Sequence, residues 1–166
     1  LIIQTLKLGA KLDIPNTLNQ KSLEIILNRR KSHYLLSIIL ANSLPSVSIS
    51  CDFYMPSQSE VYKDKPLSGL SYLIESSVNL EVVRELVIRG VDINKADKSG
   101  ITPFAYAVSE QKFSYITPLL EGQEKKGGEL ALNVKVPKKF NFFKEAPKYT
   151  TPLNYTIKYR VFDQVK

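Results

Sequence analysis

The 166 residues of this chain include one cysteine, Cys51, one histidine, His33, and no tryptophan. A single thiol excludes an internal disulfide, which fits a reducing compartment. Zinc sites need several nitrogen or sulfur ligands, so these two residues do not provide one. No local pattern supports a Cys51–His33 nucleophile and base, since a lone cysteine is most often a small buried apolar residue. We therefore expect no metal, no cofactor and no catalytic residue.

Long apolar runs are also missing, because no stretch approaches the roughly 20 residues that cross a bilayer. The opening residues, LIIQTLKLGAKLD, have no basic leader and no small-residue cleavage site, so they do not predict a secretory signal. They begin without methionine, in the middle of an apolar pattern, so we expect an excerpt of a longer protein. A hydrophobic content of 43% and a charged content of 23% are ordinary for a globular domain.

Glycine is sparse in the stretch DKSGITPFAYAV, residues 97–108, where a phosphate-binding loop would need several glycines followed by lysine. Instead, Thr102 and Pro103 suit the N-cap and first position of a helix, predicted as PFAYAVSEQ. Asp97 begins a turn before it, and Gly100 supplies a positive φ. The stretch therefore predicts a turn that leads into a capped helix.

The next residues predict a second helix, KFSYITPLL (112–120), with four apolar residues on one side: Phe113, Ile116, Leu119 and Leu120. Pro118 would lie inside this helix, where it removes a hydrogen bond and bends the axis. We interpret four nearby carboxylates as a solvated helix face and turn rather than a catalytic pair: Glu75, Glu81, Glu85 and Asp92.

The turn and helix recur along the chain. TPLNYTI (151–157) copies TPFAYAV (102–108), whereas SGLSYLI (68–74) and KSLEIIL (21–27) are weaker copies. Copies of one short unit predict a stack in which each unit packs on its neighbours.

The spacing of these copies is regular in part. Leu70 precedes Phe104 by 34 positions, and Gly90 precedes Phe104 by 14, as Gly9 precedes Leu23. Gly9 and Gly90 each follow a predicted helix, at the left-handed stop that glycine favours.

These residues resemble the ankyrin repeat, with its G-x-T-P-L-H-x-A-A opening and L-L-x-x-G-A-D close. The resemblance is best at 66–121 and 150–157. It implies an all-α solenoid of helix-turn-helix units whose loop tips and concave helix face bind other proteins. The family's histidine is replaced in successive copies, so we expect looser packing between units: Glu24, Ser71, Ala105 and Asn154 stand there.

Two stretches exceed the repeat length. We expect one domain, truncated within a repeat at each end, with units at about 1–13, 14–50, 66–97, 98–122 and 150–166. Insertions at about 44–66 and 122–149 would project from the stack as lengthened loops, in place of the usual hairpin. The first is rich in serine and proline and contains an alternating run, VSISCDFY; the second becomes basic and aromatic.

Charge is unevenly distributed along the chain. Residues 1–50 carry six basic and two acidic groups, residues 51–121 seven and ten, and residues 122–166 ten and four. The basic end includes a run in which lysines alternate with phenylalanines. This pattern suits contact with an acidic protein, whereas the alternative is that the phenylalanines form a small core of the insertion itself. The predicted partner-binding residues are Lys138, Lys139, Phe140, Phe142, Phe143, Lys144, Lys98 and Tyr106.

The function expected from the resemblance is a non-catalytic module that binds a protein partner. The alternatives are a substrate-recruiting segment of a larger enzyme and a structural spacer. Nucleic acid is not an expected partner because arginine is scarce and no nucleic-acid motif is present, and membrane contact is a weak alternative. Lysine outnumbers arginine 18 to 5, and this composition resembles that of ankyrin proteins that intracellular bacteria deliver into host cells. The expected location is the cytoplasm, including that of a host cell.

Overall fold

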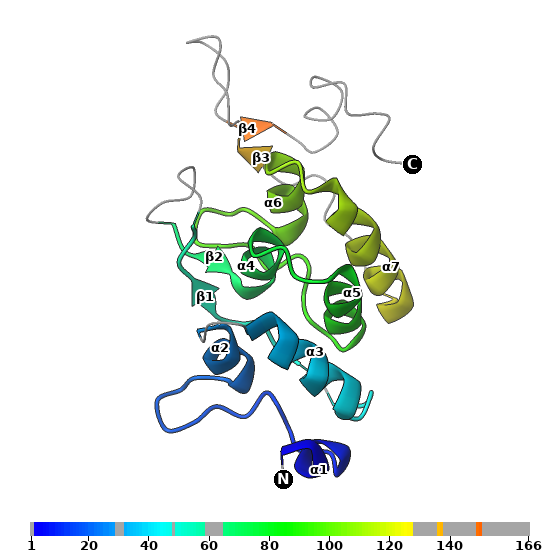
Figure 1. Cartoon of the computed structure of the whole chain (residues 1–166). Helices are drawn as coiled ribbons and strands as arrows, with labels where there is room; N and C mark the ends of the chain where they lie inside the picture. Colours follow the sequence, from blue (N-terminus) through cyan, green and yellow to red (C-terminus); the bar gives the residue numbers. More distant parts are fainter. Residues whose placement is uncertain are drawn as a thin grey trace.

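The computed structural model of this chain describes residues 2–28, 32–47, 49–58, 65–127, 136–137 and 149–150. Helices dominate these residues, as expected from the sequence. There are seven α-helices in the described part: α1 (Ile2–Lys7), α2 (Ser22–Leu27), α3 (Ser32–Asn42), α4 (Gly69–Glu75), α5 (Leu80–Ile88), α6 (Pro103–Ser109) and α7 (Ile116–Lys126) (Figure 1). A 3₁₀ turn, η2 (Phe113–Tyr115), leads directly into α7.

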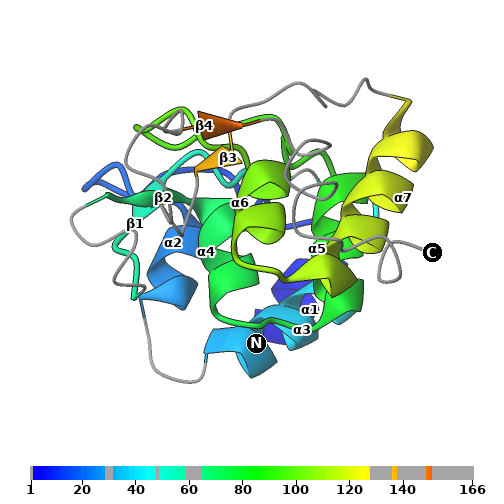
Figure 2. The ribbon, with the colours of Figure 1, turned by 90° about the horizontal axis from the view of Figure 1, so that it is seen from above.

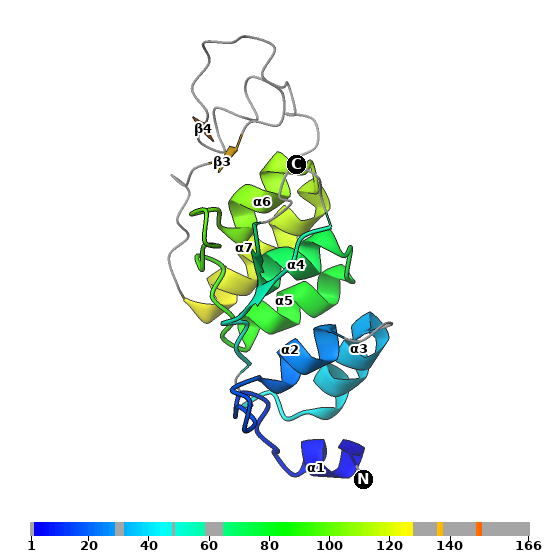
Figure 3. The same ribbon diagram turned by 90° about the vertical axis from the view of Figure 1, so that its left-hand side faces the viewer.

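The helices form stacked pairs. Figure 3 shows α2 with α3, α4 with α5 and α6 with α7 at successive levels, and α1 beyond α3 at the N-terminal end. Viewed from above in Figure 2, α2, α4 and α6 form one column, while α1, α3, α5 and α7 form a second column. Neighbours within the second column are in contact along its whole length, most extensively α5 with α7.

Two short antiparallel strand pairs accompany the helices, which an all-α description leaves out. β1 (Tyr54–Met55) pairs with β2 (Leu67–Ser68), with Tyr54 opposite Ser68. β3 (Val136–Pro137) pairs with β4 (Tyr149–Thr150), with Val136 opposite Thr150. Both pairs lie on the side of the first column in Figure 1. Each pair thus joins two residues inside a predicted insertion to two residues at or just after its C-terminal end.

Helix starts follow the capping pattern of the sequence. The Thr102 hydroxyl accepts a hydrogen bond from the Ala105 amide at 3.2 Å, with Pro103 in the first turn of α6, as predicted. Ser68 caps α4 in the same way, with the Ser71 amide 3.5 Å from its Oγ. These side chains satisfy amides that otherwise have no partner within the helix.

The ends of α4 and α6 also match. After α4, the Ser77 amide donates to Ile74 O and the Val78 amide to Leu73 O. After α6, the Gln111 amide donates to Val108 O and the Lys112 amide to Ala107 O. Ser77 and Gln111 both have a positive φ, of 55° and 57°. This pattern is the left-handed helix stop, here without glycine.

The turns before α2 and α6 share a second geometry. Asp97 Oδ1 accepts from the amides of Ser99 (2.7 Å) and Ile101 (2.9 Å), and Gly100 has a φ of 80°, which confirms the predicted turn. Asn16 Oδ1 accepts from the amides two and four residues later, at 3.0 and 2.9 Å. A short side chain that binds the following backbone holds each turn.

The first insertion does not project from the stack in its described part, so that expectation is wrong there. Ile49, Cys51, Phe53 and Met55 are all buried, at 3–7% exposure. Their alternation with polar residues is the period of an extended segment with one buried face. The Phe53 ring lies so close to Gly69 that a Cβ there would be 2.8 Å away, which leaves room only for glycine at the start of α4.

The second insertion begins later than the predicted residue 122. α7 continues to Lys126, and Gly127 ends it with a φ of 73°. Pro118 lies in the first turn of this helix, because η2 occupies the preceding residues. A proline in the first turn removes no intrahelical hydrogen bond, so the predicted bend has no cause.

Candidate partner-binding surface

Most of the predicted contact residues belong to the basic and aromatic run in the second insertion. Lys138, Lys139, Phe140, Phe142, Phe143 and Lys144 lie outside the described residues. The run begins directly after β3 and ends before β4, and β3 contacts α6. The contact role of this run therefore stays a prediction.

Tyr106 is a core residue and does not belong to an exposed surface. It is 1% exposed, and its hydroxyl donates to Glu75 Oε1 at 3.1 Å. Its position in the middle of α6 is buried because that helix is buried on every side. The predicted role of Tyr106 in partner contact is corrected accordingly.

Lys98 is exposed and lies where three segments of the chain meet. Its Nζ is 5.6 Å from the centroid of the Tyr54 ring, a cation–π contact between the α5–α6 loop and β1. Tyr54 itself is 39% exposed. Lys21, which precedes α2, joins this surface through a salt bridge with Asp52. We call the surface the loop edge and define it by Lys21, Ser50, Asp52, Tyr54, Lys95 and Lys98.

Asp52 lies between two lysines of the loop edge. Its Oδ2 is 3.6 Å from Lys21 Nζ, and its Oδ1 is 3.8 Å from Lys95 Nζ. Ser50 Oγ donates to Asp52 Oδ2 at 2.6 Å and accepts from Lys21 Nζ at 2.8 Å. The hydrogen bond from Ser50 lowers the pKa of Asp52, partial burial opposes this, and the two ammonium groups reinforce it. Asp52 is therefore a carboxylate held ionised among cations.

The loop edge has a net positive charge, since it contains three lysines and one exposed carboxylate, which Lys21 and Lys95 face. Below it lies Asp97, which is 6% exposed and whose Oδ2 has no hydrogen-bond partner among the described residues. Burial raises the pKa of Asp97, against the lowering effect of the amides of Ile101 and Ser99. The sequence reasoning found Lys98 but missed Lys21, Asp52 and Lys95. The alternation of VSISCDFY contains the relevant signal, because it directs Ser50, Asp52 and Tyr54 to one face.

Glu75 at the end of α4 is not a solvated carboxylate, which corrects that expectation. Its Oε1 accepts from Ser57 and Tyr106, and its Oε2 accepts from the Gln58 amide at 3.0 Å. These bonds fasten the segment after β1 to the first column. Glu81 and Glu85 form ion pairs with arginines of their own helix, Arg84 and Arg89.

Arg89 links two helix pairs. It is 7% exposed, its Nη2 donates to Leu40 O at 2.9 Å, and its Nη1 donates to Leu44 O at 3.3 Å and to the Ser43 hydroxyl. Glu85 balances its charge at 2.6 Å. An arginine from the end of α5 thus satisfies carbonyl groups at the end of α3, where helices leave acceptors unpaired.

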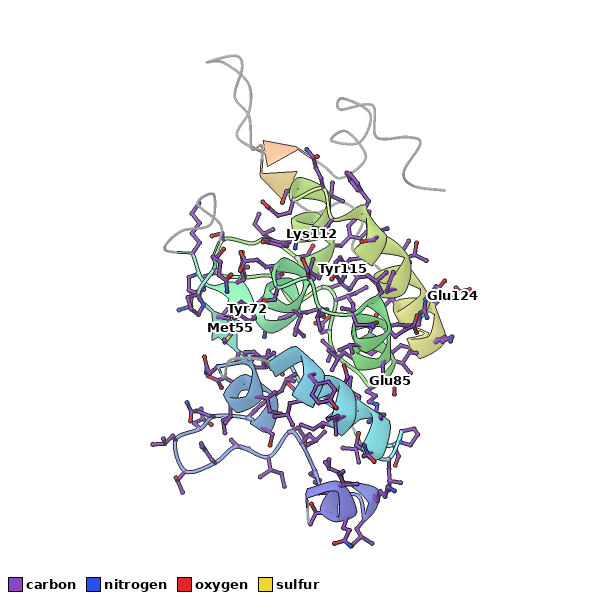
Figure 4. All side chains as sticks on the ribbon, in the orientation of Figure 1. Met55, Tyr72, Glu85, Lys112, Tyr115 and Glu124 are labelled. Atoms are coloured by element: carbon purple, nitrogen blue, oxygen red, sulfur yellow. The ribbon has the colours of Figure 1, made fainter. Side chains whose placement is uncertain are left out.

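Two lysines repeat this arrangement further along the stack. Lys112 Nζ donates to Ile74 O (2.8 Å) and Glu75 O (2.7 Å), at the end of α4. Lys126 Nζ donates to Gly90 O (3.2 Å), just after α5. Lys112 and Tyr115, labelled in Figure 4, come from the segment between α6 and α7 and donate to carbonyl groups at the end of α4 and shortly after it. Each cation therefore joins one helix pair to the end of a helix in the pair before it.

The chemistry of Cys51 agrees with a structural role. Burial raises the pKa of its thiol far above the ordinary value, and the neighbouring Asp52 carboxylate adds to this effect. A protonated, buried thiol is a poor nucleophile.

None of the helices in the described part of the chain has the length and apolar character that a membrane span requires.

Comparison with known proteins gives no family assignment. No family model matches the sequence, and no curated protein matches it either.

Proposed function

We propose that this chain is a divergent ankyrin-repeat module that binds a protein partner through its loop edge and first-column helices. The observation that carries the proposal is a pair of helix caps at one spacing. The N-caps Ser68 and Thr102 are 34 positions apart, as are the left-handed stops Ser77 and Gln111. Two helices that begin and end in the same way at this distance support a repeating unit of about 33 residues.

A second spacing supports the same proposal. Gly9 and Gly90 end their helices with positive φ and are 81 positions apart, as are the turn residues Asn16 and Asp97. The segment that connects one unit to the next therefore has the same geometry before α2 and before α6. Repeat proteins of this type leave loop tips and one helix face free for partners, because each unit buries only its contacts with neighbours.

The chemistry of the loop edge favours an acidic partner. Three lysines and a partly exposed tyrosine combine charge, which accelerates association, with an aromatic surface of the kind enriched in interfaces. The basic run at residues 138–144 is a second proposed contact, and it follows β3, which contacts α6. The proposal also includes the role of a bacterial effector in host cytoplasm, which rests on composition. The alternatives, a recruiting segment of a larger enzyme and a spacer, differ in that a spacer binds no partner.

The test is a pull-down from host-cell lysate with mass spectrometry, followed by binding kinetics with each captured protein. Lys95→Glu with Lys98→Glu should slow association most at low salt, because rim charges act mainly on the on-rate. The matched control is Lys7→Glu with Lys125→Glu, since both lysines are exposed on second-column helices. Lys138→Glu with Lys139→Glu tests the second contact in the same assay.

The outcomes separate the proposed surfaces. Slower association in the Lys95 and Lys98 variant alone supports the loop edge, whereas an effect of Lys138 and Lys139 alone assigns the contact to the insertion. If all three variants slow association equally, the interaction depends on the net charge of the chain and not on either proposed surface. A wild-type chain that captures no specific protein would contradict the binding-module proposal and favour the spacer.

A further inference from the structure

The loop edge already holds one carboxylate, that of Asp52. Neither lysine beside it is within hydrogen-bonding distance of the carboxylate oxygens, at 3.6 and 3.8 Å. Lys21 uses one of its three donors on Ser50, and Lys95 is 45% exposed at its side chain. Lysine presents three rotatable donors on a flexible stem, so both ammonium groups retain donors for a further anion.

Resting on the proposed function, we propose that Lys21, Lys95 and Lys98 form a receptor for the carboxylates of an acidic peptide, and that Asp52 is a built-in competitor for it. An incoming carboxylate shares the ammonium groups that Asp52 faces, and is repelled by Asp52 itself. Removal of the Asp52 charge therefore strengthens binding, although Asp52 is part of the surface. This distinguishes the proposal from a simple basic patch, in which every residue of the surface contributes attraction.

The geometry favours carboxylate over phosphate. The ammonium groups of Lys21 and Lys95 already face one carboxylate, that of Asp52, although lysine binds carboxylate and phosphate alike as a point charge. The two arginines described in the structure, Arg84 and Arg89, are engaged with glutamates on α5. Lys98 lies over one face of the Tyr54 ring, so that face is not open for a base to stack on.

The experiment uses the full chain and a fluorescent, end-blocked pentaglutamate peptide, with affinity measured by anisotropy at about 20 mM and about 150 mM salt. The decisive variant is Asp52→Asn, since the asparagine amide oxygen still accepts the hydrogen bond from Ser50. The matched control is Glu124→Gln, which removes the same charge from an exposed position on α7, in the second column (Figure 4). Circular dichroism and thermal melting verify that each variant folds.

We expect Asp52→Asn to bind the peptide about three- to fivefold more tightly at low salt, the range of an exposed charge interaction. Glu124→Gln should change affinity less than twofold. Lys95→Gln with Lys98→Gln should weaken binding, and Asp52→Asn should give no gain in that background. The gain should also shrink at the higher salt concentration, because the groups are exposed.

Unchanged or weaker peptide binding by a folded Asp52→Asn protein overturns the competitor role. A wild-type chain that does not bind pentaglutamate overturns the receptor, and leaves the partner-binding proposal to its own pull-down assay. A single-stranded oligothymidylate of equal charge serves as the second probe. If it binds more tightly than the peptide and responds to the same variants, the carboxylate assignment is wrong and the surface recognises phosphate.

Discussion

Gly122 in α7 offers a direct test of how the helix pairs stack. The residue faces α5, and a Cβ added there would lie 2.7 Å from Val87 Cβ and 2.8 Å from its Cγ1. It would also lie 3.2 Å from the carbonyl oxygen of Arg84, which is backbone and cannot turn aside. Carbon atoms in contact prefer separations of about 3.5–4.0 Å. Gly122→Ala therefore forces α5 and α7 apart.

The magnitude follows from two opposing effects. An added methyl group in a packed interior costs about 1–3 kcal/mol, and Val87 is 0% exposed and β-branched, so it has no alternative rotamer to adopt easily. Alanine is favoured over glycine within a helix by about 1 kcal/mol. We expect a net destabilisation of about 1 kcal/mol, where an exposed helical glycine would give a gain of the same size.

The assay is urea unfolding monitored by circular dichroism, with the free energy of unfolding obtained by linear extrapolation. Glu124→Ala is the control in the same helix, because Glu124 is exposed and its replacement should change stability by less than about 0.5 kcal/mol. If Gly122→Ala is as stable as the wild type or more stable, the close packing of α5 on α7 is wrong.

Two further predictions concern buried charges. Arg89→Met should reduce the free energy of unfolding by about 3 kcal/mol, because it removes the donor to carbonyl groups at the end of α3 and leaves Glu85 unpaired. An unchanged urea midpoint would contradict this link between helix pairs. Asp97→Asn should stabilise the protein at neutral pH, because burial raises the pKa of this carboxyl and Asn16 shows that asparagine fits the same turn. A raised folded-state pKa means that the ionised group opposes folding, so the gain should vanish as pH falls below the unfolded-state pKa of about 3.9. A gain that stays constant down to pH 3 would point to a cause other than ionisation.

The local geometry of the helix pairs was largely predictable from the sequence. Thr102 and Pro103 could be read as a helix start, and Gly90 as a helix stop, because caps depend on the residue at a single position. Ser77 and Gln111 escaped notice, since non-glycine residues with positive φ have no clear signature. The equal spacings that begin at Gly9 and Gly90 also indicated two equivalent segments. Only their hydrogen bonds show that Asn16 and Asp97 are equivalent within these segments.

The candidate surface was less predictable, for a physical reason. Lys21, Asp52 and Lys95 come from three segments that are distant in sequence, and only the packing of residues 49–55 on α4 brings them together. That packing was not expected, because serine and proline in the insertion indicated a loop. The alternation of apolar and polar residues in VSISCDFY is nevertheless typical of an extended segment with one buried face. Tyr106 was misassigned because its residue type alone does not show whether a tyrosine in a short helix points outward or into the core.

The cations between the helix pairs connect stability with the proposed surface. Ser71 and Ala105 stand where the proposed ankyrin repeat would have a histidine, and both are fully buried. Lys112 and Arg89 instead reach back to the carbonyl ends of the previous pair, so the bonds between units come from the ends of helices. Such bonds fix the distance from one unit to the next on the side of the helix ends. The loop edge lies at the connections between helix pairs. The distances between its lysines therefore depend on how the helix pairs are stacked. Loss of Arg89 should therefore weaken partner binding as well as folding, even though this residue is buried and touches no partner.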